Sequence, residues 1–365
     1  MASHLAAILP AKGQPFQVQT RPTPKPGPDE LLIVVKSVAL NPADVIMRDQ
    51  GLFISEYPTV IGFDMAGLVL EVGENVPTTS CFRSGIRVAA YSASAWKGCH
   101  PNHGPFQERC LVPWQHAVPL PDTISWNHAA TLPVSVQVPL SAWDMMGIPR
   151  LNGRPTSQSS CVEKKEAILV WGASSSIGTM SVQTARLLCQ DPKSPFAAVY
   201  ATSGSANHKY ISSLGADQVF DYKDPSVVES IISAAKDEGL ALRHCFLATG
   251  ELASCQAVLK AFVETNPKGK KKIAKIGSAP WIPKDAENVD GVEVIFVMPS
   301  MVEEERLEQF SYWIGTYLGD NLGKGTIKPS PEPTVVGKGL GFINDAVDRM
   351  AQGVSCTKLV VEIGQ

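Results

Sequence analysis

The stretch Ala167-Ile-Leu-Val-Trp171-Gly172-Ala-Ser-Ser-Ser-Ile-Gly178 decides the fold of this chain. It starts with an unbroken apolar run, which is typical of a strand buried on both faces of a sheet. A turn of small residues follows, after which Ile177, Met180, Leu187 and Leu188 recur at the spacing of one helix face. Unpaired N–H groups and the helix dipole favour an anion at such a helix start. The stretch therefore predicts a phosphate-binding turn.

The glycine pattern of this turn is an imperfect dinucleotide fingerprint. It reads Gly172-x-x-Ser175-x-x-Gly178 instead of G-x-G-x-x-G. A purely structural turn between a strand and a helix is the alternative interpretation. The buried strand before the turn and the strand, helix and strand pattern around it favour the cofactor interpretation.

Outward from the turn, the chain shows two kinds of pattern. From Asn127 onward, continuous apolar strands alternate with helices, which predicts a parallel sheet covered on both faces. These strands are expected at 167–171, 196–202, 218–220, 244–248 and 272–277, and helices at 179–189 and 226–236. Before about residue 120, short β-branched runs between Gly and Pro predict a mainly β part, with strands at 31–39, 65–73, 85–91 and 109–113. A helical stretch is expected at 301–318, and the tail from 325 to 365 is expected to hold a helix at 341–352 and a final strand at 358–362.

Length and composition set limits on the class of protein. A chain of 365 residues exceeds one core of about 250–300 residues and predicts two domains. Hydrophobic residues at 44% and charged residues at 18% exclude intrinsic disorder. A net charge of −3 gives no overall positive potential that would attract nucleic acid or an anionic membrane. The eight cysteines are scattered without a C-x-x-C pair, and no signal-like or membrane-spanning apolar segment occurs. We therefore expect a reduced, cytoplasmic protein.

Two polar segments are expected on the surface. The Ser-rich residues 151–166 predict a loop before the first buried strand. The basic run 268–272 resembles a nucleic-acid patch, but five residues in a net-acidic chain are typical of a solvated turn.

The end of the second apolar strand bears on the choice of cofactor. A carboxylate there would hold the 2′-hydroxyl of NAD, but residues 201–209 contain none. Ser203, Ser205, Asn207 and Lys209 offer hydroxyls, an amide and a positive charge to a 2′-phosphate. The segment therefore favours NADPH over NADH, and simple loop solubility is the alternative.

The order of motifs along the chain resembles the medium-chain dehydrogenase/reductase superfamily, in its zinc-independent quinone reductase and enoyl reductase branch. The most similar members are the trans-acting enoyl reductases that partner fungal polyketide synthases, whose turn is typically Ser-rich. The matching stretches cover most of the chain and include Val38-Ala-Leu-Asn41-Pro-Ala-Asp44, Pro58-Thr-Val-Ile-Gly62-Phe-Asp64-Met-Ala-Gly67, Gly104-Pro-Phe-Gln-Glu108, Leu214-Gly-Ala-Asp217 and Asp221-Tyr222-Lys223.

The resemblance implies an α/β fold: a Rossmann-type doubly wound parallel sheet plus a GroES-like, mainly β catalytic domain. The catalytic domain is expected to be discontinuous, at 1–125 and 325–365, with the dinucleotide domain at 126–324 between. Cofactor contacts carried over from the family, together with those expected from the turn and the second strand, are Ala43, Asp44, Val45, Ile46, Ser174, Ser175, Ser176, Ile177, Gly178, Ser203, Ser205, Ala206, Asn207, Lys209, Tyr222, Gly277, Lys358 and Leu359. Tyr222 is alternatively a packing residue.

The resemblance also implies that no metal is bound. Zinc-dependent members carry a cysteine ligand where Asn41 stands and Gly-His-Glu where Gly62-Phe63-Asp64 stands, so the expected thiolate and imidazole ligands are missing. A Cys/His site formed by Cys99, His100, His103 and Cys110 is the alternative, although this stretch is a surface loop in the family.

Without a metal, a hydride donor requires an acceptor that is already electrophilic, such as an α,β-unsaturated thioester or a quinone. The tyrosine that serves some enoyl reductases is replaced here by Phe53, which leaves solvent or Tyr57 as proton donor; Tyr57 is alternatively a packing residue. Substrate is expected in a cleft between domains, beside Phe53, Gln137, Val138, Ser141, Val297 and Met298, each alternatively a packing residue.

Three functions follow from this reasoning. The first is a trans-acting, NADPH-dependent enoyl reductase with a polyketide synthase partner. The second is a quinone or enone reductase, and the third is a non-catalytic NADPH-binding relative. The protein is expected to be a monomer or a homodimer.

Overall fold

The computed structural model describes residues 2–150, 163–264 and 272–364, and the chain forms two compact units. One unit combines Met1–Gln137 with Ser300–Gln365, and the other is Val138–Pro299. These bounds differ from the expected domain bounds at 125 and 325, because the segments 126–137 and 300–324 group with the first unit. The polar segment 151–162 and the basic residues 268–271 lie outside the described residues.

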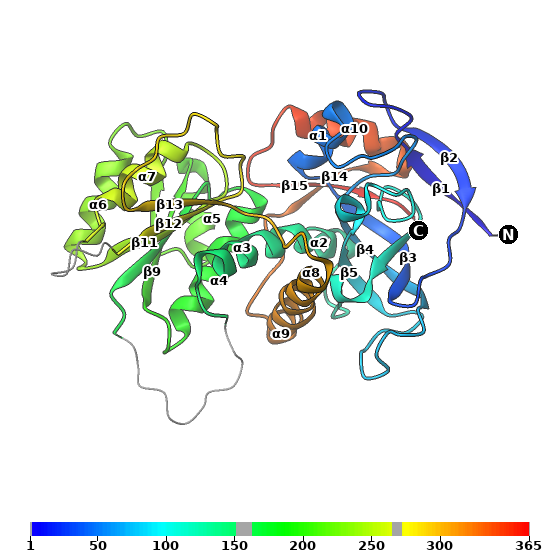
Figure 1. Ribbon diagram of the computed structural model, residues 1–365, viewed down its shortest axis with the longest axis horizontal. Helices are drawn as coiled ribbons and strands as arrows, with labels where there is room; N and C mark the ends of the chain where they lie inside the picture. Colours follow the sequence, from blue (N-terminus) through cyan, green and yellow to red (C-terminus); the bar gives the residue numbers. More distant parts are fainter. Residues whose placement is uncertain (1, 151–162, 265–271, 365) are drawn as a thin grey trace. The chain divides into compact units, whose positions relative to one another are not determined.

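The second unit is built on a six-stranded parallel sheet (Figure 1). Its strands in spatial order are β10 (Gln218–Asp221), β9 (Phe196–Ser203), β8 (Glu166–Trp171), β11 (Ala241–Leu247), β12 (Ala274–Ser278) and β13 (Val292–Phe296). Numbered along the chain, this is the order 3-2-1-4-5-6 of a Rossmann fold. The expected doubly wound sheet is confirmed.

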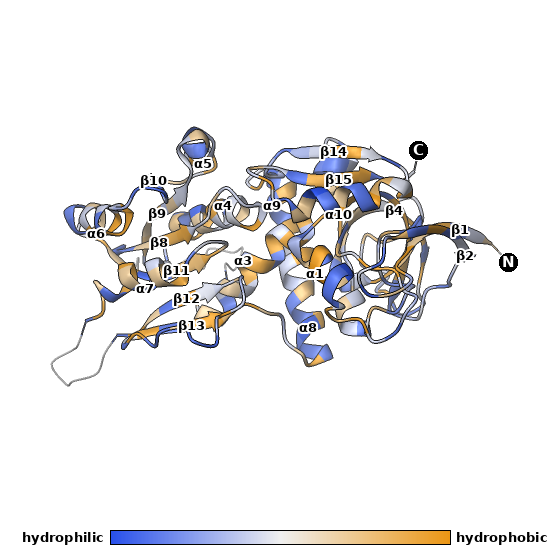
Figure 2. Ribbon diagram, turned by 90° about the horizontal axis from the view of Figure 1, so that it is seen from above, coloured by the Kyte–Doolittle hydropathy of each residue, from blue (hydrophilic) through white to orange (hydrophobic). Residues whose placement is uncertain are grey.

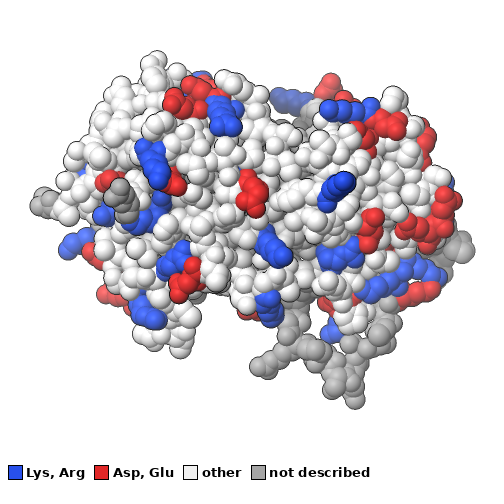
Figure 3. Space-filling view, turned by 180° about the vertical axis from the view of Figure 1, so that it is seen from behind, with Lys and Arg blue, Asp and Glu red and all other residues white. Residues whose placement is uncertain are grey.

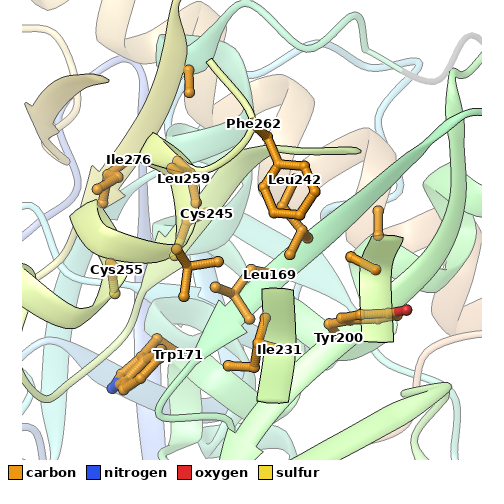
Figure 4. Close-up of a cluster of buried hydrophobic side chains, with 14 of the residues drawn as sticks. Leu169, Trp171, Tyr200, Ile231, Leu242, Cys245, Cys255, Leu259, Phe262 and Ile276 are labelled. Atoms are coloured by element: carbon orange, nitrogen blue, oxygen red, sulfur yellow. The ribbon is translucent and has the colours of Figure 1, made fainter. Parts of the chain in front are cut away.

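Helices cover both faces of this sheet. On one face, α6 (Val227–Asp237) and α7 (Leu252–Lys260) pack against alternate strand residues such as Leu169 and Cys245 (Figure 4). On the other face, α3 (Leu132–Met146) sends Trp143 against Phe246, with the ring centroids 5.9 Å apart. α4 (Ser176–Gln190) packs on β8 and β9, and α5 (His208–Ser213) packs on β9 and β10. Figure 2 shows α6 with one polar and one apolar side, as a helix on a sheet requires.

The first unit is mainly β, as expected. A seven-stranded sheet contains β14 (Pro333–Lys338), β15 (Lys358–Glu362), β3 (Glu30–Ala39), β4 (Asp64–Val72), β5 (Arg87–Tyr91) and β7 (Ala117–Pro119) in that order, and β6 (Arg109–Pro113) pairs with β3. β1 (Ser3–Ile8) and β2 (Gln17–Pro22) form a separate antiparallel pair. The helices α1 (Pro42–Gln50), α2 (Trp126–Ala130) and α10 (Ile343–Ala351) complete this unit together with the helical segment described next.

The stretch expected to be helical at 301–318 is not one continuous α-helix. It consists of α8 (Glu303–Phe310), a π-helix at Ser311–Leu318 and α9 (Gly319–Lys324). Phe310 anchors it to the β part of the same unit, since its ring stacks on His116 with centroids 3.9 Å apart and meets Tyr91 at 4.9 Å. This packing explains why 300–324 belongs to the first unit and not to the dinucleotide unit.

The surface carries both signs of charge. Figure 3 shows Lys and Arg interspersed with Asp and Glu on the face drawn there, in agreement with the small net charge of −3. Within the described ranges, no helix is long and apolar enough to cross a membrane.

Candidate active site

The carboxyl end of β8 lies at the point where the strand order of the sheet reverses. β8 lies between β9 and β11. The strands that follow β8 along the chain are therefore added first on its β9 side and then on its β11 side. Open α/β sheets bind ligands at this switch point, outside the carboxyl ends of the strands. The turn 172–178 begins at this end of β8 and leads into α4.

The turn itself is shaped by its glycines and by Ser175. Gly172 has a φ of +80°, which favours glycine, and its carbonyl oxygen accepts a hydrogen bond from the Ser175 hydroxyl at 2.9 Å. Ser175 caps α4, because its Oγ accepts the N–H of Gly178 at 3.1 Å. A Cβ on Gly178 would lie far inside van der Waals contact with the carbonyl oxygen of Gly172. Strand and helix therefore approach as closely as a pyrophosphate-binding turn requires.

The other residues expected at the pyrophosphate lie in the same turn. Ser174, Ser176 and Ile177 are half-buried at the start of α4. The first turn of this helix also presents N–H groups without helical partners, as every helix start does. The backbone and the small side chains thus fit the diphosphate of a nicotinamide cofactor.

The expected 2′-phosphate region lies at the ends of β9 and β10. Ser203 is fully buried and its hydroxyl donates to the carbonyl of Gly204 at 3.3 Å, whereas Ser205, Ala206 and Lys209 are exposed and Asn207 is half-buried. Tyr222 is 49% exposed, and a Cβ on Gly204 would lie 3.9 Å from its ring. The ring of Tyr222 is exposed beside this loop, and its contact with the cofactor stays a prediction.

A carboxylate from outside residues 201–209 also lies in this region. Asp221, at the end of β10, accepts the N–H of Ser205 through Oδ2 at 3.3 Å. Hydrogen bonds from the N–H groups of Lys223 and Ser205 hold the pKa of Asp221 below its usual value, with help from the charges of His208 and Lys223. The neighbourhood of Ser205 therefore combines one negative group with several positive ones.

Gly277 lies in β12 beside two elements expected to border the substrate. A Cβ on Gly277 would lie 3.1 Å from Ala142 of α3 and 3.4 Å from Val297. In the same unit, Ser141 is buried, Val138 is half-buried and Met298 is exposed. Gln137, which is buried, and Phe53, which is 39% exposed, belong to the first unit.

A buried polar cluster occupies the first unit at the start of α1. The Nζ of Lys358 donates to Oδ1 of Asn41 at 2.7 Å and lies 3.0 Å from Oδ2 of Asp64. Asn41 donates through Nδ2 to the same Asp64 oxygen at 3.0 Å. Lys358 is only 2% exposed, so its ammonium group faces the interior of this unit rather than solvent. Leu359, the other candidate in β15, is fully buried.

Asp44 completes the cluster on the backbone side. Its Oδ2 accepts the N–H of Asn41 at 2.7 Å, while its Oδ1 is buried without a hydrogen-bond partner. Burial raises the pKa of Asp44 to about 8, with a further contribution from the nearby Asp64, against the lowering effect of the Asn41 hydrogen bond. Ala43, Val45 and Ile46 of the same turn are half-buried.

The residues of the alternative Cys/His site have other partners. His103 pairs through Nε2 with Oε1 of Glu30 at 2.8 Å, and the thiol of Cys110 donates to the His103 carbonyl at 3.3 Å. In the parts of the chain that the structure describes, no group of three or more His, Cys, Asp or Glu residues is placed to hold a metal ion.

Tyr57 lies beside the turn that ends α1. Its hydroxyl oxygen is buried without a partner and lies 3.0 Å from where a Cβ on Gly51 would be. Burial raises the pKa of Tyr57. These contacts leave the role of Tyr57 as a proton donor a prediction.

Comparison with known proteins places the chain in a family. Residues 27–122 match the alcohol dehydrogenase GroES-like domain. The trans-enoyl reductase tndF of Aspergillus flavipes is 38% identical over 99% of this chain and 99% of its own length. The chain belongs to the medium-chain dehydrogenase/reductase superfamily, among the relatives of the fungal enoyl reductases. The trans-enoyl reductase tazE of Aspergillus terreus is 41% identical over 84% of this chain and 95% of its own length.

Solved structures support the fold of this superfamily member. An alcohol dehydrogenase superfamily protein from Novosphingobium aromaticivorans matches 99% of this chain and 100% of its own with a TM-score of 0.76 at 17% identity. The CurK enoyl reductase covers 99% of both chains with a TM-score of 0.69, also at 17% identity. The expected family and fold are confirmed, and the family's members are oxidoreductases.

Proposed function

We propose that this protein is an NADPH-dependent, zinc-independent enoyl reductase that acts in trans on α,β-unsaturated thioesters carried by a polyketide synthase. One observation carries the proposal: a fungal trans-enoyl reductase aligns with it over nearly the whole length of both chains. The Ser-rich turn at the switch point of the sheet supports a bound nicotinamide dinucleotide.

The residues at the positions of the zinc ligands support a reaction that does not require zinc. Where zinc-dependent relatives have a cysteine and a histidine, this chain has Asn41 and Phe63. The ammonium group of Lys358 is bonded to both Asn41 and Asp64, so a positive charge already occupies the centre of this cluster. A divalent cation would be repelled by that charge, and an amide oxygen is a poor ligand for zinc.

The preference for NADPH rests on the loop after β9. Lys209 is exposed, and the hydroxyl group of Ser205 and the amide of Asn207 lie within the same short segment. A 2′-phosphate gains charge-assisted hydrogen bonds from such groups. Asp221 beside Ser205 weakens this attraction without removing the positive charges of Lys223 and Lys209.

When bound, the cofactor supplies a hydride to a conjugated acceptor. The residues of this chain bind and orient: the turn 172–178 holds the diphosphate at the start of α4, and Tyr222 offers its exposed ring to the adenosine end. The proton for the α-carbon comes from solvent or from Tyr57.

Substrate specificity separates the proposed function from its alternatives. NADPH oxidation is followed with crotonyl and longer enoyl thioesters and, separately, with a small quinone. The proposal predicts turnover of the thioesters and no loss of rate after treatment with EDTA. Turnover of the quinone alone favours a quinone reductase, while NADPH binding without any turnover favours a non-catalytic relative.

A further inference from the structure

A cavity of about 410 Å³ lies in the second unit at the carboxyl ends of β11 and β12. Leu247 and Ser278, the last residues of these strands, line it together with Gln256 of α7. Ligand sites have volumes of about 300–1,000 Å³, so the cavity is large enough to take a ligand or a side chain. No residue of the turn 172–178 lines it, and α7 covers the face of the sheet opposite α4. The cavity is therefore separate from the phosphate-binding turn. The apolar part of its wall consists of Leu252, Ala253, Pro280, Pro283 and Ala286.

The ring of Trp281 forms an exposed and fixed platform at this cavity. Trp281 lines the cavity from the loop after β12, and it is 60% exposed. Its ring stacks on Phe296 with the centroids 4.4 Å apart and the planes inclined by 10°. The Ser278 hydroxyl donates to the carbonyl of Pro280 at 2.8 Å, which fixes the loop just before Trp281. Exposed tryptophans held in this way are typical anchors of protein interfaces.

A buried amide offers an unused acceptor in the cavity wall. Gln256 is 4% exposed, and its Nε2 donates to the carbonyl oxygen of Glu287 at 2.7 Å. A carbonyl oxygen can only accept, so the nitrogen end of the amide is identified. Within residues 2–150, 163–264 and 272–364, Oε1 of Gln256 accepts no hydrogen bond. Buried polar side chains are rarely left with such an atom unpaired, so Oε1 indicates a donor that comes from outside the chain.

The charged groups at the cavity are all negative. Glu251, Asp285 and Glu287 line it and are exposed, whereas no Lys, Arg or His residue lines it. In the parts of the chain that the structure describes, none of these three carboxylates has an ion-pair partner. The cavity therefore combines acceptors and uncompensated negative charge with an aromatic ring, which is the combination that binds an organic cation.

We propose that this cavity is the docking site for an arginine side chain of a partner protein. A guanidinium group carries five N–H donors and no acceptor, so it can bond both to Oε1 of Gln256 and to the carboxylates. Its plane stacks on aromatic rings such as that of Trp281, which the compact ammonium group of a lysine does less well. The aliphatic stem of the arginine packs on the apolar part of the wall.

This inference goes beyond the proposed reaction. An enzyme that acts in trans on a carried thioester must contact the protein that carries it, and the cavity supplies a surface for that contact. The identity of the partner as a polyketide synthase rests on the proposed function. The recognition of an arginine rests on the cavity alone.

The test titrates a short peptide into the full-length protein. The probe is acetyl-Gly-Leu-Arg-Gly-amide, and the indole N–H resonance of Trp281 is followed by NMR after its assignment through Trp281→Phe. We expect a saturable shift with a Kd on the order of 1 mM, as a single anchored side chain supplies. The matched peptide with citrulline in place of arginine has nearly the same shape without the charge, and it is expected to bind at least about tenfold more weakly. Equal binding of the two peptides, or no binding of either, overturns the inference.

Two double variants with the same change of charge test the position of the site. Asp285→Asn with Glu287→Gln removes two carboxylates from the cavity, while Glu229→Gln with Glu293→Gln removes two exposed carboxylates elsewhere in the same unit. All four side chains are exposed, so both proteins are expected to fold. Saturation transfer to the leucine methyl groups of the arginine peptide measures its Kd. We expect a Kd about tenfold higher in the first variant and changed less than about twofold in the second. Equal changes in the two variants show that the peptide binds through net charge alone and contradict the inference.

The two proposals fail separately. Wild-type protein that reduces enoyl thioesters but does not distinguish arginine from citrulline keeps the enoyl reductase and loses the docking site. Wild-type protein that binds the arginine peptide selectively but reduces no enoyl thioester keeps the docking site and loses the proposed function, together with the synthase as its partner.

Discussion

The ammonium nitrogen of Lys358 lies 3.0 Å from Oδ2 of Asp64, and the two side chains are 2% and 0% exposed. This pair joins the final strand β15 to the first residue of β4. Removing one partner of a buried pair leaves the other charge uncompensated, at a cost of about 3–5 kcal/mol. The pair is therefore expected to be a major determinant of the stability of the first unit.

The first prediction concerns this pair. Lys358→Met is expected to lower the free energy of unfolding by about 3–5 kcal/mol in urea denaturation. Lys338→Met is the matched control, because Lys338 pairs with Glu362 at 3.0 Å while its side chain is 82% exposed, and it is expected to cost below about 1 kcal/mol. Equal losses in the two variants contradict the account.

The second prediction concerns the phosphate-binding turn. Gly178→Ala places a methyl group against the carbonyl of Gly172, which the backbone must move to accommodate. We expect a loss of about 1–3 kcal/mol in stability and a weaker Kd for NADPH, measured by fluorescence titration. Gly323→Ala in α9 is the control, since nothing lies within 4 Å of its added Cβ. Unchanged NADPH binding in Gly178→Ala shows that the turn does not hold the cofactor.

The third prediction concerns the choice between NADPH and NADH. Lys209→Ala is expected to weaken NADPH binding about tenfold and leave NADH binding unchanged, because only NADPH carries the 2′-phosphate. Asp221→Asn removes the negative charge of the carboxylate that accepts the N–H of Ser205 and is expected to tighten NADPH binding. A preference of the wild type for NADH, or equal effects of Lys209→Ala on both cofactors, contradicts the assignment of this loop.

The fourth prediction concerns pH. Because the pKa of Asp44 is raised to about 8 in the folded state, the folded protein holds a proton that the unfolded chain releases above about pH 4. The contribution of Asp44 to stability is present at low pH and is lost as the pH rises through this range toward 8. Wild type is therefore expected to lose stability relative to Asp44→Asn by up to about 1.4 kcal/mol per pH unit between pH 5 and 8. Urea unfolding at four pH values measures this difference, and a constant difference shows that Asp44 is ionised in the folded protein.

Local patterns in the sequence predicted the parts of the fold that depend on near neighbours. The expected strand 167–171 is β8 within one residue, and the helix expected at 179–189 is α4 (Ser176–Gln190). A buried strand, a turn and a helix are adjacent along the chain, so their residue types are sufficient to indicate them. The helix α3 contains Pro139, a residue that usually interrupts a helix, so residue types alone are a weaker guide to its extent.

These local patterns do not predict contacts between segments that are distant in the sequence. Asp221 reaches Ser205 only because β10 pairs with β9, and Lys358 reaches Asn41 only because β15 pairs with β3. The resemblance to the family predicts Lys358 near the cofactor, but it does not predict the bonds of its ammonium group to Asn41 and Asp64. Such pairs depend on strand register, which a single sequence does not reveal.

The central claim, reduction of a conjugated thioester by hydride from NADPH, is tested most directly by isotope transfer. EDTA-treated protein is incubated with crotonyl-N-acetylcysteamine and NADPH labelled with deuterium at C4 of the nicotinamide, on each face in turn, and the product is examined by NMR. The account predicts a butyryl thioester that carries one deuterium at the β-carbon from one of the two labelled cofactors. Recovery of unreduced crotonyl thioester from both incubations, by a protein that binds NADPH, would contradict it.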